Sequence, residues 1–297
     1  MPETNEKLQT PVQQKNTWLL DFARNNTSQH GEDGIIEKVL EVIGEMDKWC
    51  VEFGSWDGMH CSNTYSLIKD KGYAAVLIEG SAKRFKDLLK TFEGNDRVHA
   101  MNQFVGFEAA DSLNTILAET EMPQNFDLLS IDIDGNDYHV WDALKQYKPK
   151  VVVIEFNPTI ANSVEFVQPR DMSLGQGSSC LSLTKLAKEK GYELVCCTLG
   201  NAIYVDSKYF DKFGIEDNSV EVLRKDQSLI THLFCGYEGT VFIRGYGGSP
   251  WQQIPFKEKK FQILPRWARK RFGDKNPIRR SLGKKYRRFL KRLSNWK

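Results

Sequence analysis

Short apolar segments alternate with amphipathic segments over most of the chain. Runs of roughly four to eight apolar residues are typical of strands, and they lie at 49–53, 74–78, 98–101, 126–133 and 151–156. Apolar residues at intervals of three or four predict helices, at 32–43, 63–69, 82–92, 111–117, 138–147 and 181–190. Two further runs, 192–197 and 201–205, resemble a hairpin. The alternation predicts an α/β protein with a doubly wound, mostly parallel sheet.

The pattern divides the 297 residues into three parts. Residues 1–27 are a polar extension, residues 28–256 hold the alternating elements, and residues 257–297 form a basic tail. Residues 158–178 lack clear periodicity, and we interpret them as a lid or substrate loop. The polar start has no signal-peptide pattern, and the apolar runs are shorter than the roughly 20 residues that span a membrane. We therefore expect a cytoplasmic protein.

The distribution of charge indicates which partners to expect, and the cysteine spacing indicates whether a zinc site is present. Residues 257–297 contain 17 Lys and Arg residues but only two acids, Glu258 and Asp274, which gives this tail a net charge of +15. The rest of the chain carries −13. Two such different surfaces predict two kinds of partner. The six cysteines form no CxxC pair, so we expect reduced thiols and no zinc site.

Polar side chains and glycines gather where four of the predicted strands end. They are Glu52–Gly58, Glu79, Asp132 with Asp134, and Glu155 with Asn157. In an open parallel sheet, ligands bind beyond the carboxyl ends of the strands, near the point where the strand order reverses. We therefore expect these side chains to surround one binding site. The alternative is that the acids only cap helices.

The first strand-end loop indicates the chemistry of the ligand. It reads EFGSWDG and lacks the GxGxxG pattern that cradles a pyrophosphate. Its carboxylates would repel phosphate but suit a ligand with an amino group and a sulfonium. Glu79 ends the second strand, in the position of an acid that holds a ribose diol. The pattern favours S-adenosylmethionine over NAD or ATP.

Five segments carry a more specific signal. They are SQHGEDGII (28–36), VEFGSWDG (51–58), VLIEG (76–80), LLSIDIDGNDYHVW (128–141) and VVVIEFNP (151–158). In order and spacing this series resembles the FkbM-type methyltransferases, which act on sugars and small hydroxylated molecules. The resemblance covers about residues 28–205, and IDIDGND is its most specific part.

The resemblance implies the seven-stranded, Rossmann-like class I methyltransferase fold, with S-adenosylmethionine at the first loop. It implies that Glu79 binds the ribose and that Asn102 and Gln103 lie near the adenine. Many family members have IDVEG or IDIEG where this chain has IDIDG, which leaves the role of Asp134 open. The residues expected to bind the cofactor are Glu52, Gly54, Ser55, Asp57, Gly58, Glu79, Asn102 and Asp132.

Methyl transfer to a hydroxyl needs an aligned acceptor and a base or a metal to remove its proton. We expect Asp132 to face the acceptor and Asp134 to lie in the following turn. Asp132, Glu155 and Asn157 offer oxygen ligands, an arrangement similar to that of metal-dependent O-methyltransferases, in which a cation such as Mg²⁺ orients the acceptor. The alternative is that these groups cap helices and anchor hydrogen bonds.

Histidines are further candidates for the base, because their ordinary pKa lies near neutrality. His30 is the first choice, provided that its segment folds back over the strand ends. His60 follows the cofactor loop, and His139 begins the helix after IDIDGND. The other two histidines, His99 and His232, have no motif around them and are interpreted as structural. The catalytic candidates are therefore Asp132, Asp134 and His30.

The tail combines positive charge with apolar residues at helical spacing. These apolar residues are Leu282, Tyr286, Phe289, Leu290, Leu293 and Trp296. A basic amphipathic helix of this kind suits an anionic membrane surface. Binding to nucleic acid, docking on an acidic protein surface and a solvated extension are the alternatives.

Together, these patterns predict an S-adenosylmethionine-dependent O-methyltransferase that acts on a sugar hydroxyl of a glycan, a surface polysaccharide or a lipid-linked saccharide. We expect it to be cytoplasmic and peripheral on the inner face of the membrane. Two alternatives stay open. One is methylation of a small natural product, and the other is a nucleic-acid-binding protein or RNA methyltransferase that uses the basic tail.

Overall fold

The computed structural model describes residues 15–270 and 276–293. Most of the expected extension at 1–27, and Trp296 of the tail, lie outside the described residues. The chain forms two compact units, Met1–Asp226 and Gln227–Lys297, called here the first and second units. This division falls earlier than the expected boundary at 257, because the strands between 231 and 255 pair only with one another.

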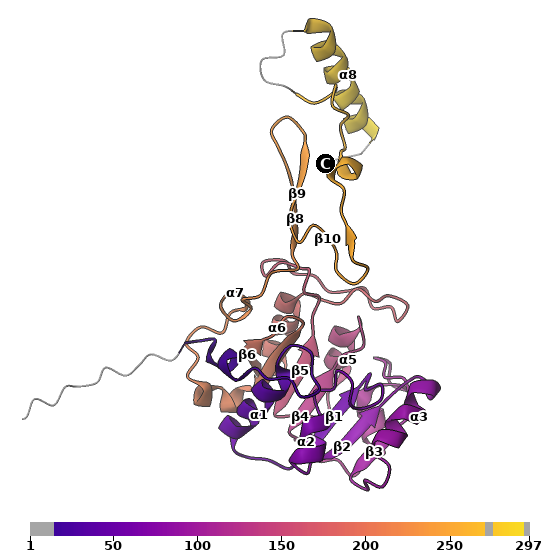
Figure 1. Ribbon diagram of the computed structural model, residues 1–297, viewed down its shortest axis with the longest axis vertical. Coiled ribbons are helices and arrows are strands. Elements are labelled where there is room, and N and C mark those ends of the chain that lie inside the picture. Colours follow the sequence, from indigo (N-terminus) through magenta and orange to yellow (C-terminus); the bar gives the residue numbers. More distant parts are fainter. Residues whose placement is uncertain (1–14, 271–275, 294–297) are drawn as a thin grey trace, which may run out of the picture. The chain divides into compact units, whose positions relative to one another are not determined.

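A seven-stranded sheet forms the centre of the first unit (Figure 1). Its strands are β1 (Trp49–Phe53), β2 (Ala74–Ile78), β3 (Val98–Met101), β4 (Leu128–Ile131), β5 (Val151–Glu155), β6 (Tyr192–Cys197) and β7 (Asn201–Asp206). Their order is β3-β2-β1-β4-β5-β7-β6, and β7 runs antiparallel to both of its neighbours. This is the class I methyltransferase topology, as predicted. The order reverses between β1 and β4, and in sheets of this kind ligands bind beyond the carboxyl ends of the strands at such a point.

Helices and 3₁₀ helices precede, connect and follow these strands. They are η1 (Trp18–Phe22), α1 (Glu32–Ile43), α2 (Tyr65–Asp70), α3 (Ala82–Thr91), α4 (Leu113–Leu117), α5 (Asp137–Ala143), α6 (Cys180–Glu189), η2 (Ser207–Phe213) and α7 (Val220–Leu223). The predicted helices are confirmed, with ends shifted by a few residues. The segment before residue 28 is not only an extension, because Trp18 and Leu19 are buried and Trp18 Nε1 donates to the Phe213 carbonyl at 3.0 Å.

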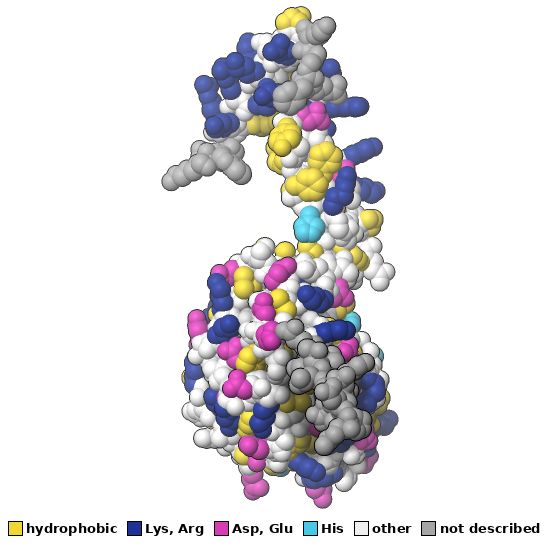
Figure 2. Space-filling model, turned by 90° about the vertical axis from the view of Figure 1, so that its left-hand side faces the viewer, with side chains coloured by type: hydrophobic (Ala, Val, Ile, Leu, Met, Phe, Trp, Pro, Cys, Tyr) yellow, Lys and Arg dark blue, Asp and Glu magenta, His cyan; other side chains and the backbone are white. Residues whose placement is uncertain are grey.

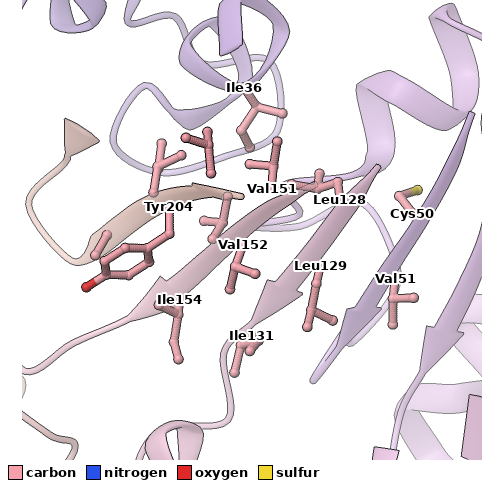
Figure 3. Packing of buried hydrophobic residues seen from close by; sticks show 14 of the residues in the cluster. Ile36, Cys50, Val51, Leu128, Leu129, Ile131, Val151, Val152, Ile154 and Tyr204 are labelled. Atoms are coloured by element: carbon pink, nitrogen blue, oxygen red, sulfur yellow. The ribbon is translucent and has the colours of Figure 1, made fainter. Parts of the chain in front are cut away.

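The apolar strands supply the core of the first unit. Figure 3 shows Val51, Leu129 and Ile154 projecting from three adjacent strands, with Ile36 and Tyr204 in the same cluster. All are at most 1% exposed. Since strands of a parallel sheet are covered on both faces, their near-continuous apolar character follows from burial.

A buried ion pair lies at the amino ends of the strands. Asp127 is fully buried at the start of β4, and Lys150 Nζ lies 2.8 Å from its Oδ1. Lys150 also contacts Asp47 at 2.7 Å, and the backbone N–H groups of Asp47 and Lys48 donate to Asp127. The carboxylate is thereby fully satisfied, which a buried charge requires.

Lys150→Met should destabilise the first unit, because it leaves the buried Asp127 carboxylate without its cation. We expect the free energy of unfolding to fall by roughly 3 kcal/mol, measured by urea denaturation at pH 7. Lys145→Met, which removes the exposed pair with Asp142, should change it by less than about 0.5 kcal/mol. Equal effects of the two substitutions would contradict this account.

The second unit contains small antiparallel pairs and one long helix. Its elements are β8 (Thr231–Cys235), β9 (Val241–Gly245), β10 (Gly248–Ser249), β11 (Ile254–Pro255), η3 (Glu258–Phe261) and α8 (Pro277–Leu293). The helix predicted in the tail is therefore confirmed over its described length. Asn276 caps it, with its Oδ1 accepting from the backbone N–H groups of Ile278 and Arg279. Among the described residues, no helix has the length and apolar character needed to cross a bilayer.

Candidate functional site

The predicted site residues follow from the register of the sheet. Phe53 pairs with Ile78 and Ile131, and Ile131 pairs with Ile154. Ile78 pairs in turn with Met101. One position further along lies what we call the terminal row, which runs across the sheet as Asn102, Glu79, Gly54, Asp132, Glu155 and Asn201. Four of these six residues, Gly54, Glu79, Asp132 and Glu155, were predicted from strand ends, and Asn102 from the resemblance; the structure brings all five to one edge.

Glu79 holds the first loop against the end of β2. Its buried carboxylate accepts from the backbone N–H of Trp56 at 2.9 Å and from that of Ser81 at 2.6 Å. Ser55 Oγ donates to the Ile78 carbonyl at 3.2 Å. Asp57 instead turns back into its own loop, where its Oδ1 accepts from the N–H groups of Met59 and His60. The loop is therefore preorganised.

The two glycines of this loop are explained by protein neighbours. Gly54 has φ +71°, and a Cβ there would collide with the carbonyl oxygen of Asp132. Gly58 has φ +73°, and a Cβ there would collide with the side chains of Leu88 and Phe92 on α3. Both positions require glycine. They let the loop fit between β4 and α3, so approach to a ligand is not needed to account for them.

Glu52 anchors the next turn of the chain. Its buried carboxylate accepts from Ser62 Oγ at 2.6 Å, from the Asn63 N–H at 2.8 Å and from Thr64 Oγ1 at 2.7 Å. Burial raises its pKa, although these hydrogen bonds oppose the rise. Both oxygens of Glu52 thus accept hydrogen bonds from the protein itself, so Glu52 stabilises the turn at residues 62–64.

The end of β3 adds an aromatic side chain that sequence reasoning missed. Asn102 Nδ2 donates to the carbonyls of Glu79, at 2.7 Å, and Gly80. Phe104 is 74% exposed, and a Cβ on Gly80 would collide with its ring. An exposed ring beside Gly80, the residue that follows Glu79, offers a stacking surface for a planar base. The available signal was a lone aromatic residue just after the predicted strand 98–101.

Three carboxyl groups form a cluster beside this loop. Asp132, Asp137 and Glu155 each present an oxygen within 4.8 Å of the others. Asp132 is exposed, Glu155 half-buried and Asp137 buried. The backbone N–H groups of Ile133 and Gly135, both at 2.9 Å, donate to Asp137 and close the turn. Asp134 lies in that turn with φ +57°, and its charge adds to the rise in the pKa values of Asp132, Asp137 and Glu155. Its catalytic role stays a prediction.

The crowding changes the protonation of all three groups. Loss of water around its carboxyl group, with the charge of Asp132 next, raises the pKa of Glu155 to about 10. The same causes, with Asp137 as the main charge, raise the pKa of Asp132 to about 7, although much of that residue is exposed. Burial raises the pKa of Asp137 to about 6, against hydrogen bonds that lower it. The cluster thus holds protons near neutral pH.

The predicted metal ligands are only partly brought together. Asp132 and Glu155 belong to the carboxyl cluster, whereas the side chain of Asn157 makes hydrogen bonds within the loop that follows β5. The Nδ2 of Asn157 donates to the Gln176 carbonyl at 2.7 Å, and its Oδ1 accepts from the Thr159 N–H and hydroxyl. Asp137 takes the third place. Three carboxylates can bind a hard divalent cation. Without a cation, the same groups can share protons among themselves.

The loop at 158–178 is braced by buried Gln168. Its Oε1 accepts from the N–H groups of Gln176 and Gly177, and its Nε2 donates to the Leu174 carbonyl at 2.9 Å. A Cβ on Gly135 would lie about 3 Å from Leu174 and Gln168. The loop therefore packs directly on the turn that follows Asp132, as a substrate loop should.

The three candidate histidines differ in their surroundings. His139 Nε2 lies 2.8 Å from the Gln168 carbonyl, so it fixes the loop. His60 is exposed and packs edge-on against Trp56. His30 is exposed, and its N–H donates to Glu32, whose other oxygen accepts from Asn201 in the terminal row. Glu32 thus links the His30 segment to Asn201 at the site edge, and the role of His30 as a base stays a prediction.

Backbone strain is concentrated in the same loops. Among the described residues that are not glycine, Trp56, Cys61 and Asp134 have positive φ, as do Lys48 and Gln253. The first three follow β1 or β4. Such conformations are costly for these residue types and gather at functional sites. The strain supports a binding role for this edge.

Comparison with known proteins gives a likeness of fold. A scan of protein-family models and a search of curated proteins both found no match. Among solved structures, the N-terminal domain of EvdMO1 with SAH bound is 10% identical, with a TM-score of 0.41, over 60% of this chain and 82% of that one. An O-methyltransferase from Bacillus cereus in complex with SAH is 21% identical, with a TM-score of 0.40, over 63% and 84%.

The carboxyl cluster should make stability fall as pH rises. Each raised pKa means that the folded state binds protons which the unfolded state releases near pH 4, so the free energy of unfolding should decline between about pH 5 and pH 9. Glu155→Gln should flatten this decline and stabilise the protein at pH 8, as measured by urea unfolding at several pH values. Glu121→Gln, at an exposed position, is the control and should follow the wild type.

Proposed function

We propose that the first unit is an S-adenosylmethionine-dependent O-methyltransferase that acts on a sugar hydroxyl of a glycan, a surface polysaccharide or a lipid-linked saccharide. The observation that carries this proposal is the terminal row. It aligns a Glu79-bound loop with a proton-holding carboxyl cluster at the point where the strand order reverses. The FkbM-type motif series supports a saccharide as acceptor.

The loop side of the row suits the cofactor. Glu79 retains lone pairs for a ribose diol, because each of its oxygens accepts one backbone hydrogen bond. Phe104 would stack on the adenine, and Asn102 would lie near the same base. The backbone of residues 54–58 would contact the amino-acid end. When bound, the cofactor supplies a sulfonium methyl group as the electrophile.

The cluster side suits the acceptor. Asp132 would accept the proton of the acceptor hydroxyl while the oxygen forms a bond to the methyl carbon and the carbon–sulfur bond breaks. The products are a methyl ether, S-adenosylhomocysteine and a protonated carboxyl group. A base is most effective when its pKa lies near the working pH, and that of Asp132 is about 7. Glu155, which stays protonated, would hold Asp132 in place.

A divalent cation is the variant of this mechanism that the same residues allow. Asp132, Asp137 and Glu155 would bind Mg²⁺, which would orient the acceptor oxygen and lower its pKa. Cation binding would first displace the shared protons from the cluster.

The alternative acceptor is a small natural product. Its methylation would use the same site and would differ only in the acceptor.

Cofactor binding can be tested by calorimetric titration with S-adenosylhomocysteine. We expect micromolar affinity for the wild type. Phe104→Ala should weaken it about fivefold to a hundredfold through lost stacking, and Glu79→Ala by more than about tenfold through the ribose and the loop. Glu93→Ala, at an exposed acid beyond α3, is the matched control. Absence of wild-type binding would refute the methyltransferase assignment.

Proton removal can be tested with a panel of soluble saccharides and labelled S-adenosylmethionine. We expect kcat/KM to rise with pH and level off above about pH 7, because Asp132 must be ionised to act as a base. Asp132→Asn should reduce kcat about 10²-fold to 10⁴-fold and leave S-adenosylhomocysteine affinity largely intact. Activity that disappears with EDTA and returns with Mg²⁺ would select the cation variant instead.

A further inference from the structure

The second unit has little interior. Its buried apolar residues among those described are Ile230, Val241, Ile243 and Ala268, and none of its residues belongs to the main core cluster. Many of its large apolar side chains are instead exposed, namely Leu233, Phe234, Tyr237, Tyr246, Trp251, Ile254, Phe256, Phe261, Ile263, Trp267, Ile278, Leu282, Phe289 and Leu293. Exposed apolar surface on this scale indicates an interaction site.

Helix α8 separates its apolar and basic residues. Ile278, Leu282, Phe289 and Leu293 recur at helical spacing along one side and are all more than half exposed. We call them the apolar stripe. The remaining sides are basic, with Arg279, Arg280, Lys284, Lys285, Arg287, Arg288, Lys291 and Arg292. In Figure 2, Lys and Arg side chains gather over this part of the unit.

The flank of α8 beside the stripe is already occupied. Tyr286 packs against Trp267 with ring centroids 5.1 Å apart, and Arg287 donates to the Ala268 carbonyl. A Cβ on Gly283 would lie about 3.5 Å from Ala268. The turn at 265–269 thus fixes the helix and leaves the apolar stripe uncovered within this unit.

We propose that the second unit is a membrane-surface module that inserts the apolar stripe and neighbouring aromatic side chains into the interface of an anionic bilayer. Residues 227–297 carry 18 Lys and Arg residues against three acids, which is complementary to anionic headgroups. A helix with one apolar and one basic side lies in the membrane plane. Trp267 and Tyr286, which pack against each other beside the stripe, are residue types favoured at the membrane–water interface.

The composition of the surface favours lipid over nucleic acid. Bases bind by stacking on aromatic rings and phosphates by charge, and neither uses exposed aliphatic side chains. Three of the four stripe residues are aliphatic, and Leu233, Ile254 and Ile263 add further exposed ones. This inference does not depend on the proposed methyl transfer, because it concerns the second unit alone.

The test is co-sedimentation of the full chain with vesicles of phosphatidylcholine containing about 30% phosphatidylserine, at about 0.15 M salt. We expect binding that pure phosphatidylcholine does not give. Leu282→Asp with Phe289→Asp should reduce the partition coefficient more than about a hundredfold. Lys284→Gln with Arg288→Gln should reduce it roughly fivefold per residue. Leu89→Asp, at a position 49% exposed on α3, is the matched control and should bind like the wild type.

Several outcomes would overturn the proposal. These are no binding of the wild type to anionic vesicles, or binding that the Leu282→Asp, Phe289→Asp pair leaves unchanged. Tight binding of a single-stranded RNA that the pair also leaves unchanged, with no vesicle binding, would assign the surface to nucleic acid. Salt-sensitive self-association without vesicle binding would assign it to the acidic first unit of another copy. Circular dichroism of each variant establishes that the fold is intact, since all substituted side chains are exposed.

Discussion

The parallel register of β2, β1, β4 and β5 is the constraint from which the candidate site follows. Level pairing of Phe53, Ile78, Ile131 and Ile154 makes the four strands end together. Whatever residue comes next on each strand must then enter the same edge of the sheet. The acid Glu79, the tight turn at Gly54 and the carboxyl groups of Asp132 and Glu155 become neighbours, although more than a hundred residues separate Gly54 from Glu155.

The two edges of the sheet treat buried acids in opposite ways. At the amino edge, Asp127 is paired with Lys150 and two backbone N–H groups, so its charge is stabilised. At the carboxyl edge, Asp132, Asp137 and Glu155 lie close together, and burial and their mutual repulsion disfavour the charged forms. These carboxyl groups therefore retain protons. One edge contributes to stability, whereas the other gives up stability, and clusters of carboxyl groups with strongly shifted pKa values are concentrated at functional sites.

The sequence predicted the strands well because buried parallel strands are continuous apolar runs, and their ends located Glu79, Asp132 and Glu155. It missed Asp137 and Phe104, because these depend on how the 132–137 turn closes and on which chain lies beside Gly80. For Asn157 the sequence located the strand end, but not the hydrogen bonds that its amide makes within the following loop, which has no periodicity. No pattern in the sequence identifies which side chains pack against a given glycine. Nor does any pattern identify which strands pair in the second unit.

The terminal row also limits where residues can be inserted into or deleted from this chain. Adding or deleting one residue inside β1, β2, β4 or β5 would shift that strand's contribution out of the row and turn its side chains to the opposite face. Length changes after the row, as in the Gln168-braced loop between β5 and α6, leave the row in register. Loop insertions can therefore change what surrounds this edge of the sheet while the strand lengths stay fixed, so related chains should differ in length mainly beyond Asn157 and much less within the strands.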